Sequence, residues 1–111
     1  MTSQGSSYGR FRRALERGNL LEAEAAAREL HGLSLADALS YCLVLARKDP
    51  PRFERAALRW HGRYELEVRE LALVDAQLSL AALAALRSDP ANGQAQRLLT
   101  ELAARLPLRG R

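Results

Sequence analysis

Along most of the chain, apolar residues return every three or four positions, which is the period of an amphipathic helix and not of a strand. Two segments depart from this pattern. Residues 35–48 and residues 75–87 are apolar on nearly every side. A helix that is apolar all round is normally buried. We therefore expect these two segments at the centre of an all-helical fold, with amphipathic helices packed around them.

Glycine, proline and capping residues divide the chain into six helices. The first lies within YGRFRRALERG, and Gly18 suits the position just after its end. Asn19 and Ser34 are residue types that cap the start of a helix, and Asp37 completes a capping box with Ser34. The five later helices are expected over residues 20–31, 35–48, 50–68, 75–87 and 91–106.

The length of the chain, 111 residues, corresponds to one domain. We place this domain at residues 9–106, because that range contains the six expected helices. Residues 1–8 are polar and rich in glycine and serine, so they are expected to form a flexible tail. Residues 107–111, from Pro107 onward, are expected to form a second flexible tail.

An internal repeat supports a paired arrangement of the helices. Residues 33–50 and residues 71–90 both begin with the pattern L-x-L-x-D-A and both end in D-P. Pro50 and Pro90 lie 40 residues apart, a period that fits a pair of helices as the repeating unit. The sequence therefore predicts an all-α fold, a compact array of about six helices in antiparallel pairs, similar to a helical repeat.

Composition agrees with this fold. Alanine and leucine dominate, isoleucine is absent, and aromatic residues make up only 5%. Such side chains lose little freedom in a helix. The stretches FRRALERGNLLEAEAAAREL and ERAALRWHGRY, together with DAQLSLAALAAL, resemble small all-helical hypothetical proteins of high-GC bacterial genomes. The resemblance implies a helical fold and carries over no site residue.

Several functions lack the residues that they require. His31 and His61 fall at predicted helix ends with no nucleophile motif nearby, so we expect no enzyme. Cys42 lies in a very apolar segment and is expected to be a buried, inert thiol. No His/Cys cluster has metal-binding spacing, and we expect neither metal nor cofactor. No apolar run is long enough to span a membrane, and residues 1–10 contain no signal-peptide core, which favours a soluble cytoplasmic protein.

The best-defined polar feature is a row of arginines in the helix expected over residues 50–68. Arg52, Arg55, Arg59 and Arg63 follow at steps of three, four and four residues and share one side of this helix. We call them the arginine stripe. Three interpretations remain open: a face that is solvated or paired with nearby glutamates, a contact for a partner protein, or a site for an anionic ligand such as nucleic acid.

The function that we favour is a non-enzymatic protein-interaction module. Its contact face would combine the arginine stripe with the neighbouring helix over residues 20–31, where Glu22 and Glu29 share a face, and it could also form a homodimer. The alternative is nucleic-acid binding through the arginine stripe, which a net charge of +4 permits without requiring it. A helix–turn–helix is disfavoured, because the second helix of the only matching segment, residues 35–48, begins without a donor for base edges.

Overall fold

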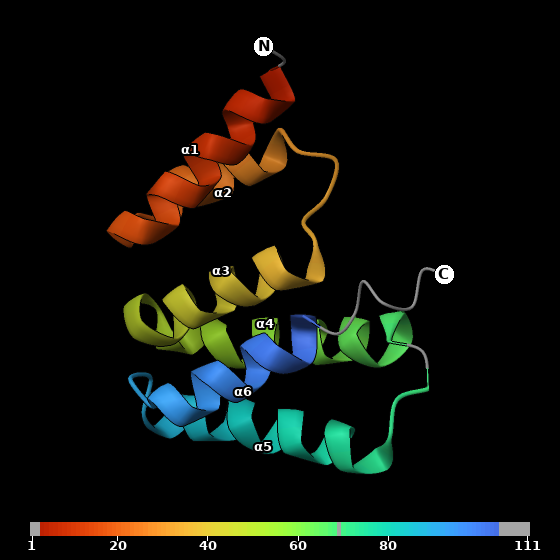
Figure 1. The fold of residues 1–111 in the computed structure, drawn as a ribbon. Coiled ribbons are helices and arrows are strands. Elements are labelled where there is room, and N and C mark those ends of the chain that lie inside the picture. The colour runs from red at the N-terminus through yellow and green to blue at the C-terminus, as the bar shows by residue number, and fades with distance from the viewer. Residues whose placement is uncertain (1–2, 69, 105–111) are drawn as a thin grey trace.

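In a computed structural model, residues 3–68 and 70–104 of the chain are described, and they form six α-helices without a strand (Figure 1). The helices are α1 (Ser3–Arg17), α2 (Leu20–Arg28), α3 (Leu35–Lys48), α4 (Pro50–Glu67), α5 (Leu73–Ser88) and α6 (Gly93–Ala104). The predicted fold class, a compact all-α array of six helices, is confirmed.

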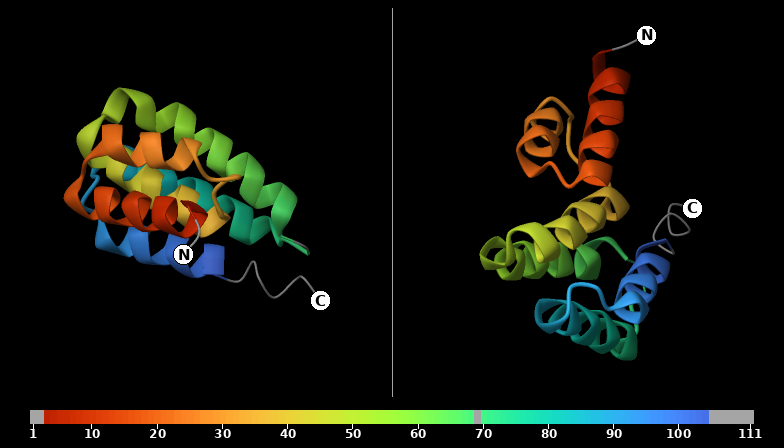
Figure 2. Two further views of the ribbon diagram at one scale, coloured as in Figure 1. Left: turned by 90° about the horizontal axis from the view of Figure 1, so that it is seen from above. Right: turned by 90° about the vertical axis from the view of Figure 1, so that its left-hand side faces the viewer.

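Three helix pairs are stacked on one another: α1 with α2, α3 with α4, and α5 with α6 (Figures 1 and 2). The two similar segments, residues 33–50 and 71–90, supply the first helices of consecutive pairs. α3 packs against each of the other five helices, so its predicted central position is confirmed. The prediction for α5 is wrong. This helix lies in the outermost layer, because the stack places the α5–α6 pair at one end (Figure 1).

The apolar interior consists of two clusters. The larger cluster joins the helices from α3 to α6 and includes Leu45, Phe53, Leu86 and Leu99, each at most 2% exposed. The smaller cluster lies in the α1–α2 pair, where Phe11 and Leu15 pack on the alanines of α2 together with Val44 of α3. Leu20 and Tyr41 are half-buried and pack against both clusters. The α1–α2 pair therefore has its own small core.

The predicted caps are present. The side chain of Asn19 accepts a hydrogen bond from the backbone N–H of Glu22 at 3.1 Å, and Ser34 accepts one from the N–H of Asp37 at 3.0 Å. Gly18, after the end of α1, has φ of 72°, a left-handed conformation that glycine adopts without strain. Each of these residues acts on backbone groups only a few residues away in the chain. The local sequence is therefore enough to mark these helix ends.

Some helix boundaries differ from those predicted. α1 begins at Ser3, so residues 3–8 are helical and do not form the tail that the sequence predicts. The early turns are held by packing, since Ser7 is only 2% exposed and its hydroxyl donates a hydrogen bond to Glu29. α2 ends at Arg28, because the next N–H groups bond three residues back and tighten the chain. The predicted tail at 107–111 lies outside the described residues.

Candidate protein-interaction groove

An open groove of about 490 Å³ lies between α3 and α4. It is mostly apolar and is lined by Ala38, Tyr41, Cys42, Ala56, Arg59, Trp60, Gly62, Arg63 and Leu66. The groove is open because α2 has nine residues and α4 has 18, roughly 14 Å against 27 Å of helix. α4 therefore extends beyond α2 at its C-terminal end, as the view from above shows (Figure 2).

Arg59 and Arg63 of the arginine stripe line this groove, and the four arginines of the stripe differ in their partners. Arg52 forms ion pairs with Asp49 at 2.7 Å and with Glu24 at 2.8 Å, and Arg63 pairs with Glu67 at 2.7 Å. The pairs of Arg52 raise the pKa of its guanidinium, chiefly through the hydrogen bond to Asp49.

Arg55 and Arg59 are exposed and have no carboxylate partner among the described residues. The charges available for an external partner are therefore those of Arg55 and Arg59.

The two other predicted contact residues lie elsewhere. Glu22 of α2 and Glu29, the residue that follows α2, both pair with Arg10 of α1, at 3.5 Å and 3.0 Å. The hydrogen bond from Ser7 is the largest cause that lowers the pKa of Glu29, and the hydrogen bond and charge of Arg10 lower it further. The structure thus brings Glu22 and Glu29 together with α1 and not with the arginine stripe. Their ion pairs stabilise the α1–α2 pair at most weakly, because they are largely exposed.

Glu24 is the residue of α2 that reaches α4. Its Oε2 accepts a hydrogen bond from the hydroxyl of Tyr41 at 2.7 Å and lies 2.8 Å from the guanidinium of Arg52. Burial, together with this hydrogen bond, raises the pKa of Tyr41 to about 12. This contact fixes α2 at the edge of the groove. The partners of Glu24 lie 17 and 28 residues away in the chain, so no local spacing distinguishes it from Glu22 and Glu29.

The aromatic floor of the groove belongs to the core. Trp60 is 2% exposed, and its Nε1–H donates a hydrogen bond of 2.8 Å to the carbonyl of Leu35 at the start of α3. Its ring stacks on Tyr64 with 5.4 Å between centroids. Burial raises the pKa of the neighbouring Cys42 thiol to about 12, so this group is protonated at neutral pH. The groove therefore offers apolar contact and positive charge but no activated nucleophile.

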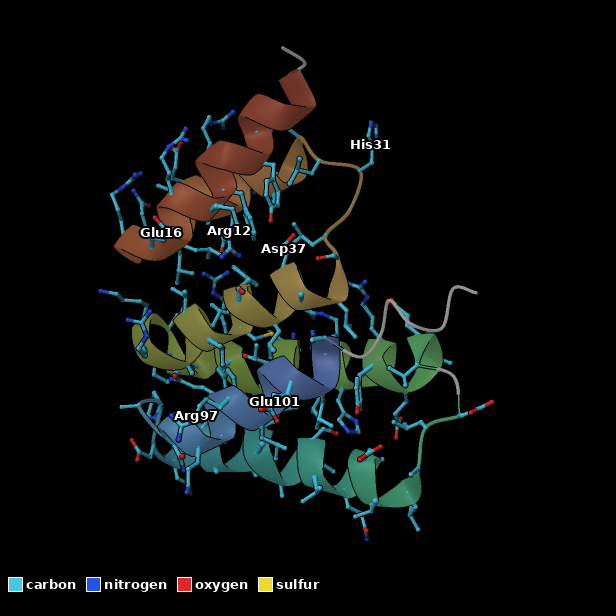
Figure 3. All side chains as sticks on the ribbon, in the orientation of Figure 1. Arg12, Glu16, His31, Asp37, Arg97 and Glu101 are labelled. Atoms are coloured by element: carbon cyan, nitrogen blue, oxygen red, sulfur yellow. The ribbon has the colours of Figure 1, made fainter. Side chains whose placement is uncertain are left out.

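The two histidines have different environments. His31 is exposed and points away from the body of the protein (Figure 3). The prediction that His61 ends a helix is wrong, since it lies inside α4 and is buried. Its Nε2 is 2.8 Å from Oγ of Ser79, whose hydroxyl donates to the carbonyl of Ala76 at 2.9 Å. Ser79 is fully buried, so this pair acts as a polar connection between α4 and α5.

Replacing Ser79 with alanine should lower the free energy of unfolding by about 1 kcal/mol. The imidazole would lose one acceptor while the carbonyl of Ala76, at 3.2 Å, remains as another, so the cost falls at the low end for a buried polar group. Urea denaturation measures the change. Thr100→Ala removes an exposed hydroxyl and should cost less than about 0.5 kcal/mol. Equal losses in the two variants would contradict the role of the His61–Ser79 pair.

Comparison with protein-family models, with curated proteins and with solved structures gives no significant match. Over the described ranges, no helix is both long and apolar enough to cross a membrane. No group of three or more His, Cys, Asp or Glu side chains in residues 3–68 and 70–104 is arranged to hold a metal ion. The function therefore has to be argued from the groove and its charges.

Proposed function

We propose that this protein is a non-enzymatic interaction module whose α3–α4 groove binds an acidic, amphipathic helix of a partner protein. One observation carries the proposal. Arg59 lines an apolar groove, and Arg55 lies one turn before it on α4; neither arginine has an ion-pair partner within the part of the chain that the structure describes. The contact face would therefore be α4 from Arg55 onward together with α3, and α2 forms its edge through Glu24.

The chemistry of the groove fits a helix better than an extended strand. A partner helix would bury its apolar side on Tyr41 and Leu66, of which Leu66 is 88% exposed in the free protein. Carboxylates beside that apolar side would pair with Arg55 and Arg59, which supplies specificity and faster association. The proposal assumes a cytoplasmic setting, in which a lone thiol such as Cys42 stays reduced.

Nucleic-acid binding is the rival function, and two contacts disfavour it. Arg52 and Arg63 are already engaged by carboxylates of the same chain. Trp60 is covered by the packing of α3 and α4, so it offers no ring on which a base could stack. Within the arginine stripe only Arg55 and Arg59 remain without an ion pair, which is few for a surface that must neutralise a run of phosphates.

A designed peptide tests the proposal. The probe is a helix of about four turns with leucines along one side and glutamates on both flanks. Trp60 is the only tryptophan and lines the groove, so its fluorescence should change when the peptide binds. The double variant Arg55→Glu/Arg59→Glu should weaken binding by about tenfold or more, corresponding to ~1.4 kcal/mol, while its circular dichroism stays unchanged.

Two controls separate charge at the groove from charge in general. Arg97→Glu reverses an exposed arginine of α6 and should keep full affinity. A peptide with lysines in place of the glutamates should not bind. Equal binding of both peptides, or an equal loss with Arg97→Glu, would contradict the proposal. Binding of duplex DNA at physiological salt that the double variant loses would decide for the rival function.

A further inference from the structure

The α1–α2 pair is attached to the rest of the protein by little apolar contact. Its two helices pack closely on each other and only lightly on α3. Among the described residues, Val44 is the only buried member of the smaller cluster that lies outside α1 and α2. The pair would therefore keep nearly all of its own core on moving away from α3.

Two carboxylates supply much of the attachment. Asp37 of α3 accepts hydrogen bonds from the hydroxyl of Tyr8 at 3.1 Å and from the guanidinium of Arg12 at 3.2 Å. Glu24 of α2 makes the contact to Tyr41 and to α4 that is described above. These side chains are partly exposed, so each contact holds the pair only weakly against competition from water or from another charged group.

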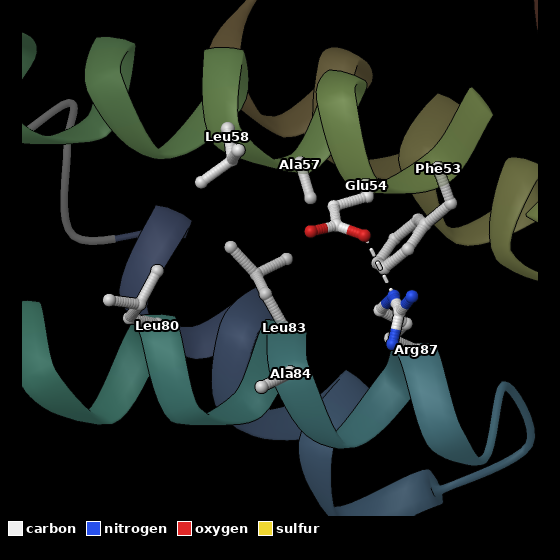
Figure 4. Close-up of a pocket in the computed structure, with 8 residues that line it drawn as sticks. All are labelled: Phe53, Glu54, Ala57, Leu58, Leu80, Leu83, Ala84 and Arg87. Carbon is white, nitrogen blue, oxygen red and sulfur yellow. Dashed lines mark ion pairs between the residues drawn. The ribbon is translucent and has the colours of Figure 1, made fainter. Parts of the chain in front are cut away.

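Another side of α4 is attached differently. There Glu54 pairs with Arg87 of α5 at 2.8 Å, and the groove that this ion pair spans is lined by core side chains (Figure 4). Phe53 and Leu83 in that lining are 2% and 3% exposed, and the larger cluster continues through them from α4 into α5. The α4–α5 contact is therefore held by its core, whereas the contact of α2 with α4 depends on Glu24.

Residues 29–34 join the α1–α2 pair to α3 and are its only covalent connection to the other four helices (Figures 1 and 2). Gly32 in this segment has φ of 119°, and a Cβ at its position would meet open space. Leu30 and Leu33 on either side are only partly buried. Glycine adopts many backbone conformations at low cost, so the pair can turn about this segment as one body.

The open groove between α3 and α4 is shorter than a stable partner helix. On α4 its lining runs from Ala56 to Leu66, roughly 15 Å of helix. A helix that forms in water needs about 12–15 residues, or about 18–22 Å. Extension past Leu66 is unfavourable for an acidic helix, because Glu65 and Glu70 lie exposed at that end. The partner helix therefore extends toward Arg52, where α2 lies.

We propose that the α1–α2 pair is an autoinhibitory element of the α3–α4 groove, an inference that rests on the proposed function. In the free protein, Glu24 takes the place of a partner's carboxylate on Arg52 and Tyr41. A partner helix displaces Glu24, the pair turns about residues 29–34, and the surface of α3 around Val44 becomes accessible. Partner affinity is reduced in the wild type, because the open state is only partly populated.

Glu24→Gln tests the competition. The amide keeps the size of the side chain but lacks the charge that holds Arg52, so the designed acidic peptide should bind about threefold to fivefold more tightly, as expected for losing a partly exposed ion pair. Glu54→Gln is the matched control, since it removes the same charge from α4 itself and should leave the affinity nearly unchanged. Weaker or unchanged binding of Glu24→Gln, or an equal gain in both variants, would overturn the proposal.

Thiol labelling measures the movement without a peptide. Val44→Cys combined with Cys42→Ala places the only thiol of the chain under the α1–α2 pair, at a position that is 5% exposed. This thiol should react with a soluble thiol reagent, and adding Glu24→Gln should speed the reaction about threefold to fivefold. Ala46→Cys with Cys42→Ala is the control, because Ala46 lies in the larger cluster at 2% exposure and should stay protected.

The two measurements separate failure of the autoinhibition from failure of the proposed function. Protection of Val44→Cys equal to that of Ala46→Cys would overturn the autoinhibition even where the peptide binds, because the pair would not open. A peptide that binds none of the variants, while Val44→Cys is labelled, would overturn the proposed function and the autoinhibition with it. Faster labelling together with tighter binding in Glu24→Gln is the result that we expect.

Discussion

Phe11→Ala should lower the free energy of unfolding of the α1–α2 pair by about 3–5 kcal/mol, the largest effect that we expect from one substitution. Phe11 is fully buried in the smaller cluster, and most of its buried neighbours there are alanines. Short side chains cannot move into the volume that the ring leaves, so the cavity persists. The α1–α2 pair should therefore unfold while the layers from α3 to α6 stay folded.

Hydrogen exchange distinguishes local from global unfolding in this variant. Amides of α1 and α2 should lose protection, and those of α3 and α4 should keep it. Leu21→Ala is the control in the same helix pair, since Leu21 is 79% exposed and its truncation should change stability by less than about 0.5 kcal/mol. Equal loss of protection in all six helices would show that the two clusters unfold as one unit.

Leu45→Ala should destabilise the larger cluster by about 2–5 kcal/mol. Leu45 is 1% exposed on α3, the helix that contacts all the others, so its cavity is bordered by several helices that cannot all move inward. Denaturant unfolding followed by circular dichroism should show a lower midpoint and an unchanged slope.

Leu66→Ala is the comparison for Leu45→Ala, because Leu66 is 88% exposed and its truncation should leave stability nearly unchanged. A cost below about 1 kcal/mol for Leu45→Ala would show that α3 is not the centre of the core. The same Leu66→Ala variant should weaken binding of the acidic peptide, since Leu66 lines the α3–α4 groove. Stability and binding are therefore expected to depend on different leucines.

The candidate site was only partly predictable from the sequence. The spacing of Arg52, Arg55, Arg59 and Arg63 predicted one face of one helix, and two of them, Arg59 and Arg63, line a groove. Pairing with the glutamates of the neighbouring helix was one open interpretation, but which glutamate meets which arginine could not be predicted, because an ion pair such as Arg52 with Glu24 depends on where two separate helices lie. For the same reason, the sequence could not show that Glu22 and Glu29 pair with Arg10 of α1 and not with the arginine stripe. The connection of His61 to Ser79 likewise joins two helices and leaves no periodic signal.

The sequence by itself determined the helices and most of their ends. Asn19, Ser34 and Gly18 act on backbone groups at most five residues away, so their effects are present in the local chain. The apolar period also identified α3 as a central helix. Only the tertiary structure decided that α5, equally apolar, lies in the outer layer. Apolar periodicity records how much of a helix is suited to burial, whereas the stacking of helix pairs decides which of its sides is covered within one chain.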